Sequence, residues 1–162
     1  MTTQTDFSDS EWETLRRAPM VAGMAITLAD PGGPIEVLKE TSAVLKFVTA
    51  ESAAQEGLVG ELAQDVRALA EQRQNPVRDF KPSSAATAGK EILEELSRAA
   101  AIVSEKGTPA DAEAFGAWLR ECAQRAADAA KEGGFMGFKA ERVSAGEQHM
   151  LDEIASAVGA AR

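Results

Sequence analysis

The sequence predicts an all-α protein, folded as a single bundle of six or seven helices. Alanine supplies much of the 44% hydrophobic content, aromatic residues make up only 5%, and Tyr is absent. Such an alanine-rich composition favours helix. Apolar residues recur at spacings of three and four in several segments, and no segment keeps the period of two that a strand would show. Glycine and proline separate these segments, as they commonly do at helix ends.

Residues 18–29, APMVAGMAITLA, are predicted to form the buried central helix of the bundle. They contain no charged residue, and a helix that is apolar on all sides needs neighbours on all sides. Twelve residues extend only about 18 Å as a helix. That is too short to cross a bilayer, which takes roughly 20 residues.

The N-terminal region is predicted to be a disordered polar tail over residues 1–9, followed by a short helix that ends at Arg17. Ser10 and Glu13 have the spacing of a capping box, in which a Ser and a Glu three residues later bond to the first turn of a helix. Pro19 is expected either to kink the chain or to start the central helix afresh.

A second helix is predicted to begin at Pro34 and to bury an apolar stripe. The stripe consists of Ile35, Leu38, Ser42, Leu45 and Val48. A turn is expected near Gly57, and another amphipathic helix should follow it. Two prolines then mark a linker near residues 74–84. Residues 10–162 are interpreted as one helical domain that contains this linker.

Three further helices are predicted in the second half of the chain. The first starts around Thr87, and Lys106 with Gly107 gives it a typical C-terminal stop. Thr108 and Pro109 start the next helix, which should run to about Lys131. Ser144 and Glu147 form a second capping-box pattern, and the last helix is expected to bury Met150, Leu151, Ile154 and Val158.

The net charge of −9 indicates a protein without a broad nucleic-acid or anionic-membrane surface, since both need a positive field. The first residues have neither the basic nor the apolar region of a secretory signal. We therefore expect a cytoplasmic protein that binds neither nucleic acid nor membrane.

No constellation of catalytic residues emerges from the sequence, so the chain is not expected to be an enzyme. The single cysteine, Cys122, falls on the apolar face of its helix, where a cysteine is usually a small buried hydrophobe. The single histidine, His149, falls on the expected solvent side. A di-iron bundle site, which requires two Glu-x-x-His motifs, is excluded because there is only one His.

Two connections share one pattern: an Ala-rich helix, an acid followed closely by Gly-Gly, and a helix with an early Glu. The first runs from Asp30 to Glu36 and the second from Glu132 to Glu147; whether they are a true repeat is left open. With the ending VSAGEQHMLDEIASAVGA, the pattern resembles the tellurite-resistance TerB-like helical domains. The resemblance is best over residues 126–160 and weaker over residues 20–45.

The resemblance implies a divalent metal site formed by the acids Asp30, Glu36, Glu132 and Glu147, with Mg²⁺ or Ca²⁺ as the ion and a role in stress response. Carboxylate oxygens are the ligands that both ions prefer. The alternative is that Glu36 and Glu147 are helix-start acids that complement the helix dipole.

Residues 133–138, GGFMGF, place three large apolar side chains on a glycine-rich frame. Phe135, Met136 and Phe138 should either cover the core as a lid or form a contact surface for a second subunit or another partner. The function expected from the sequence is that of a non-catalytic, self-associating helical interaction protein. The alternative function is TerB-like metal binding.

Overall fold

The computed structural model describes residues 1–30, 33–131 and 143–159, and the described residues contain six α-helices and no strand. The α-helices are α1 (Asp9–Ala29), α2 (Pro34–Lys46), α3 (Leu58–Glu71), α4 (Ala88–Lys106), α5 (Pro109–Lys131) and α6 (Ala145–Gly159). Short helical turns occur at Gln4–Asp6, Phe47–Glu51 and Ser52–Ala54. The predicted all-α bundle is therefore confirmed.

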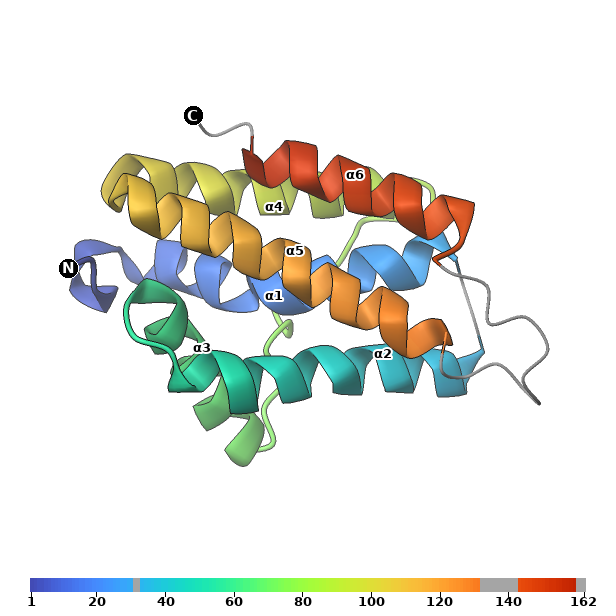
Figure 1. Cartoon of the computed structure of the whole chain (residues 1–162), viewed down its shortest axis with the longest axis horizontal. Helices are drawn as coiled ribbons and strands as arrows, with labels where there is room; N and C mark the ends of the chain where they lie inside the picture. Colours follow the sequence, from blue (N-terminus) through green and yellow to red (C-terminus); the bar gives the residue numbers. More distant parts are fainter. Residues whose placement is uncertain (31–32, 132–142, 160–162) are drawn as a thin grey trace.

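Helix α1 is the centre of the bundle, as Figure 1 shows, and it contacts each of the other five α-helices. Its fully buried side chains are Leu15, Ala18, Val21, Ala22, Ala25 and Ile26. Small residues permit this close packing: a Cβ added to Gly23 would lie 3.0 Å from Cγ2 of Val44 in α2. The predicted central helix is confirmed, but it is not covered on every side, because Leu28 near its end is 41% exposed.

Helix α1 is one helix of 21 residues that runs through Pro19, so the central helix does not start afresh at this proline. Pro19 is buried, so the surrounding helices favour the helical path although proline removes one backbone hydrogen bond. The N-cap is Ser8, with Glu11 completing the capping box, so the predicted pair Ser10 and Glu13 is wrong by two residues.

Within residues 1–9, expected to be a disordered tail, Thr2 and Phe7 are buried against the bundle while most of the others are exposed. Phe7 is buried, and its ring centroid lies 5.8 Å from that of Trp12. The two residues flank the Ser8 cap in the arrangement of a hydrophobic staple, which fixes the direction in which the chain enters a helix. Thr2 also donates a hydrogen bond of 2.6 Å to Asp111 at the start of α5.

A buried ion pair joins α1 to α4 beneath the predicted linker. Nη2 of Arg17 lies 2.6 Å from Oε1 of Glu95, whose side chain is only 5% exposed. Phe80, in the connection between α3 and α4, lies over the Arg17 guanidinium at 5.9 Å. The linker therefore packs against the core, and that core includes residues from both halves of the chain.

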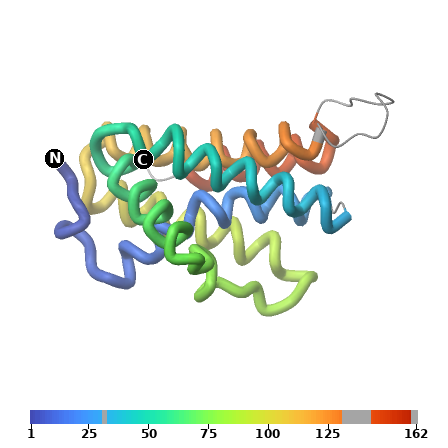
Figure 2. The backbone as a smooth tube through the Cα atoms, turned by 90° about the horizontal axis from the view of Figure 1, so that it is seen from below, coloured from blue at the N-terminus to red at the C-terminus, as the bar shows by residue number. Residues whose placement is uncertain are grey.

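Helices α2 and α3 lie on the near side of the bundle in Figure 2. The predicted turn near Gly57 is confirmed: Gly57 has a φ of +84°, a region that favours glycine, and it precedes α3. Gly60 is equally constrained, because an added Cβ would lie 1.9 Å from the carbonyl oxygen of Gln55. In the described part of the chain, no helix combines the length and the apolar character needed to cross a membrane.

Candidate functional site

The end of α1 and the starts of α2 and α6 meet at one end of the bundle (Figure 1). Gly146, in the first turn of α6, approaches α1 so closely that an added Cβ would lie 2.9 Å from the carbonyl oxygen of Ala29. Asp30 follows directly as the C-cap of α1, and Glu36 is in the first turn of α2. The structure thus brings together three of the four predicted acids, while Glu132 lies outside the described residues.

Glu40 is the acid that sequence reasoning missed. Only 2% of its surface is exposed, and it accepts a hydrogen bond from the hydroxyl of Thr27. Burial raises the pKa of Glu40, and repulsion from Glu147, Asp30 and Glu36 raises it further, although the Thr27 hydrogen bond acts in the opposite direction. We call Asp30, Glu36, Glu40 and Glu147 the carboxylate junction.

Glu147 also has a structural role in this junction. It is 4% exposed, and its carboxylate accepts a hydrogen bond of 2.9 Å from the backbone N–H of Ser144, while Ser144 Oγ accepts from the N–H of Glu147. This is the predicted capping box, which is therefore confirmed. Among the described residues, no group of three or more His, Cys, Asp or Glu side chains is arranged to hold a metal ion.

The outer face of α2 exposes large apolar side chains. Ile35 is 67% exposed and Leu38 is 66% exposed, whereas Val44 is fully buried on the opposite face. The predicted buried stripe is wrong at Ile35, Leu38 and Ser42, which are exposed, whereas Leu45 is partly buried against the core and Val48 is fully buried. The reason is that α2 turns its Glu40–Val44 face toward α1, where Gly23 makes room for Val44. We call Ile35, Leu38, Ser42 and Leu45 the α2 ridge.

Two surface grooves flank the α2 ridge. The α2–α3 groove, about 520 Å³ in volume, is lined by Leu45, Thr49, Ala50, Arg67, Ala70 and Glu71. The α2–α5 groove, about 460 Å³ in volume, is lined by Lys39, Ser42, Ala43, Lys46 and Ala129. A ridge between two grooves is the surface shape by which helices pack against one another.

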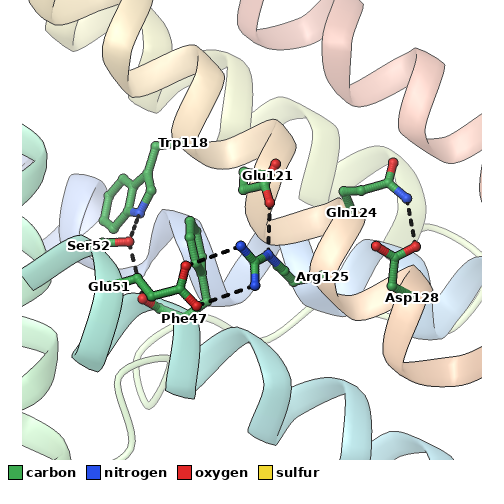
Figure 3. Close-up of polar contacts among 8 residues, drawn as sticks. All are labelled: Phe47, Glu51, Ser52, Trp118, Glu121, Gln124, Arg125 and Asp128. Atoms are coloured by element: carbon green, nitrogen blue, oxygen red, sulfur yellow. Dashed lines mark hydrogen bonds and ion pairs between the residues drawn. The ribbon is translucent and has the colours of Figure 1, made fainter. Parts of the chain in front are cut away.

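The C-terminal end of α2 is held by a set of contacts shown in Figure 3, which we call the α5 clamp. Trp118 donates a hydrogen bond of 2.8 Å to Oγ of the fully buried Ser52. The guanidinium of Arg125 lies 4.6 Å from the ring centroid of Phe47. Arg125 also bonds Glu51 at 3.1 Å and Glu121 at 2.8 Å, so α5 is linked to the Phe47–Glu51 turn by both ring and ion-pair contacts.

Cys122 and His149 have the surroundings predicted for them. Cys122 is fully buried, and burial raises the pKa of its thiol far above the ordinary value, so it does not ionise near neutral pH. The His149 side chain is 76% exposed and lies 3.6 Å from Glu153. It is at the edge of an open groove of about 940 Å³ between α4 and α6.

Comparisons with known proteins identify no relative. No family model matches the chain, and no match is found among curated proteins or solved structures. The resemblance to TerB-like domains therefore remains a prediction from the sequence.

Proposed function

We propose that this chain is a non-catalytic helical interaction protein that associates with copies of itself through the α2 ridge. The observation that carries the proposal is the exposure of Ile35 and Leu38 on a helix whose opposite face is already buried. Fully burying a side chain of this size stabilises a contact by about 1.5–3 kcal/mol. Covering both side chains in each of two copies is therefore a sizeable driving force for association.

The predicted contact residues Phe135, Met136 and Phe138 lie outside the described residues and stay a prediction. The α2 ridge supports the same function independently of them. A non-catalytic role agrees with the inert thiol of Cys122 and with the exposed position of His149.

Sedimentation velocity over a range of protein concentrations tests self-association. We expect the wild type to shift from monomer toward dimer as concentration rises, and Leu38→Glu to stay monomeric because a carboxylate replaces the apolar contact. Ala101→Glu adds the same charge at an exposed position on α4 and should behave like the wild type. A wild type that stays monomeric at every concentration rules out the proposal.

Divalent-cation binding of the TerB-like kind, with the role in stress response that the resemblance implies, is a second candidate function. Its support is electrostatic: Asp30, Glu36 and Glu147 lie near enough to the buried Glu40 to raise its pKa. A cation would relieve the repulsion among these carboxylates.

Thermal unfolding in Mg²⁺, Ca²⁺ or Mn²⁺ against chelator tests the cation proposal. An ion that binds only the folded state must raise the melting temperature by mass action. The rise should be reduced in Glu40→Gln and kept in Glu56→Gln, an exposed acid remote from the junction in sequence. Equal melting temperatures with ion and chelator would reject the site.

A further inference from the structure

Helices α4 and α6 border the open groove of about 940 Å³, on the side of the bundle opposite α2 and α3 in Figure 1. We call it the α4–α6 groove. It is lined by five residues of α4, between Gly89 and Ser97, and by five residues of α6, between His149 and Ala157. This surface is separate from the α2 ridge, so it can bind a partner whether or not the chain associates with itself.

The two walls of the groove are helices that run in the same direction. A Cβ added to Gly89 would lie 4.0 Å from Cε of Met150, and the hydroxyl of Ser97 donates a hydrogen bond of 3.3 Å to the carbonyl oxygen of Ala157. Both α4, from residue 89 to 97, and α6, from residue 150 to 157, therefore advance together along the groove. Eight helical residues extend about 12 Å. Two turns of a partner helix, with apolar side chains at positions i, i+4 and i+7, match that length.

The floor of the groove is apolar and incompletely filled. Leu93 is partly buried and packs against the core, while Gly89, Ser97 and Ala157 have small side chains or none. The hydroxyl of Ser97 is already bonded within the chain, so the floor does not need a polar partner there. A hollow of this kind between two helices can receive the side chains of a third.

The α6 wall of the groove carries negative charge that no neighbouring cation balances. On α4, Lys90 and Glu94 pair at 3.6 Å and cancel each other. On α6, Asp152 accepts a hydrogen bond of 3.1 Å from a neutral amide, and Glu153 lies 3.6 Å from His149. Neither of these two carboxylates pairs with a lysine or an arginine within the part of the chain that the structure describes. A partner that brings cations to this wall is therefore favoured over one that brings anions.

We propose that the α4–α6 groove binds an amphipathic helix of a partner protein that has lysines or arginines along one flank. The apolar stripe of that helix covers Leu93, and its basic flank contacts Asp152 and Glu153. Helices that bind in grooves use apolar anchors at this spacing, and the charges at the rim select the partner and fix its orientation.

Three designed helical peptides test this site by fluorescence anisotropy at low salt. The basic peptide has leucines along one face and lysines on one flank. The acidic peptide has glutamates in place of the lysines, and the scrambled peptide has the basic composition without an apolar face. We expect the wild type to bind the basic peptide at least about tenfold more tightly than either of the others.

Charge reversal on α6 tests the electrostatic part of the proposal. The double variant Asp152→Lys with Glu153→Lys should bind the basic peptide more than about tenfold more weakly, and should bind the acidic peptide more tightly than the wild type does. The double variant Glu13→Lys with Glu56→Lys makes the same change in net charge at exposed acids that do not line the groove. It should keep the wild-type preference.

Filling the groove tests the apolar part. Gly89→Leu has room for its side chain, because Met150 Cε at 4.0 Å is the nearest atom that its Cβ would meet. It should weaken binding of the basic peptide about tenfold and leave the melting temperature close to that of the wild type.

Two results overturn the proposal: a wild type that does not distinguish the three peptides, or a control pair that weakens binding of the basic peptide as much as the α6 pair does. The α6 pair decides the question even if Gly89→Leu fails to fold. Sedimentation of the wild type without peptide reports self-association separately, so failure of one proposal leaves the other standing.

Discussion

The two ends of α2 are held by opposite kinds of chemistry. At the C-terminal end, Trp118 donates a hydrogen bond to the buried Ser52, and the guanidinium of Arg125 lies over the ring of the buried Phe47. At the N-terminal half, Glu40 is buried among other carboxylates while Leu38 stays exposed to water. One end stabilises the fold, and the other retains an unfavourable charge and an uncovered apolar surface. An uncovered apolar surface is a common feature of sites at which proteins bind their partners.

The largest effect is expected from breaking the α5 clamp. Trp118→Ala should lower the free energy of unfolding by about 3–5 kcal/mol, because it removes a large buried side chain and leaves a cavity. Urea denaturation followed by circular dichroism measures this loss. Trp118→Phe keeps most of the volume but removes the donor to Ser52, and should cost about 1–3 kcal/mol. A loss below about 1 kcal/mol for Trp118→Ala would show that the clamp does not anchor α2.

A smaller effect is expected from separating the helix ends at the carboxylate junction. Gly146→Ala should destabilise the fold by about 1–3 kcal/mol, because the new Cβ meets the rigid backbone of Ala29. The control is Gly159→Ala in the same helix, where an added Cβ has no neighbour within 4 Å among the described residues. Its unfolding free energy should stay within about 1 kcal/mol of the wild type. Equal effects of the two substitutions would mean that the close contact between Gly146 of α6 and the backbone of Ala29 in α1 does not limit the side chain at position 146.

The smallest effect, and one of opposite sign, is expected at Glu40. Because the pKa of Glu40 is raised in the folded state, the folded protein binds more protons than the unfolded chain between the two pKa values. Its contribution to stability is therefore present at acid pH and is lost as pH rises through the folded pKa. Glu40→Gln removes the buried charge and should stabilise the protein at pH 7, by a gain on the order of 1 kcal/mol.

Chemical denaturation at several pH values checks this prediction. Glu40→Gln should differ from the wild type more at pH 7 than at pH 4, whereas the exposed Glu56→Gln should match the wild type throughout. A Glu40→Gln variant that is less stable than the wild type at pH 7 would show that the ionised carboxylate makes favourable contacts.

The α2 ridge shows why periodicity alone mispredicted a buried face. Ile35, Leu38 and Leu45 form a regular apolar stripe, and a stripe of this kind normally faces the core of its own chain. The structure instead buries the face that contains Glu40 and Val44, because Gly23 of α1 allows Val44 to approach closely. A sequence states which helix face is apolar, but not whether the chain's own core or a second molecule covers it.

The carboxylate junction was partly predictable for a related reason. Asp30, Glu36 and Glu147 mark helix ends and can be read from local signals. Glu40 lies within a helix beside Lys39, and nothing in the sequence indicates that its side chain turns inward. Its surroundings include Thr27, which donates a hydrogen bond to it, and Glu147, which repels it; both are distant from Glu40 in the chain and near it only in the fold.

The sequence by itself determined the all-α class, the central position of residues 18–29 and the bounds of most helices. These features depend on interactions within a few residues: propensity, capping and helical periodicity. Tertiary structure alone decided that α1 continues through Pro19, that Phe7 packs beside the Ser8 cap, and that α2 turns its apolar ridge outward. Each of these depends on which surface, formed by residues far away in the chain, is available to bury a side chain. The local sequence does not specify that surface.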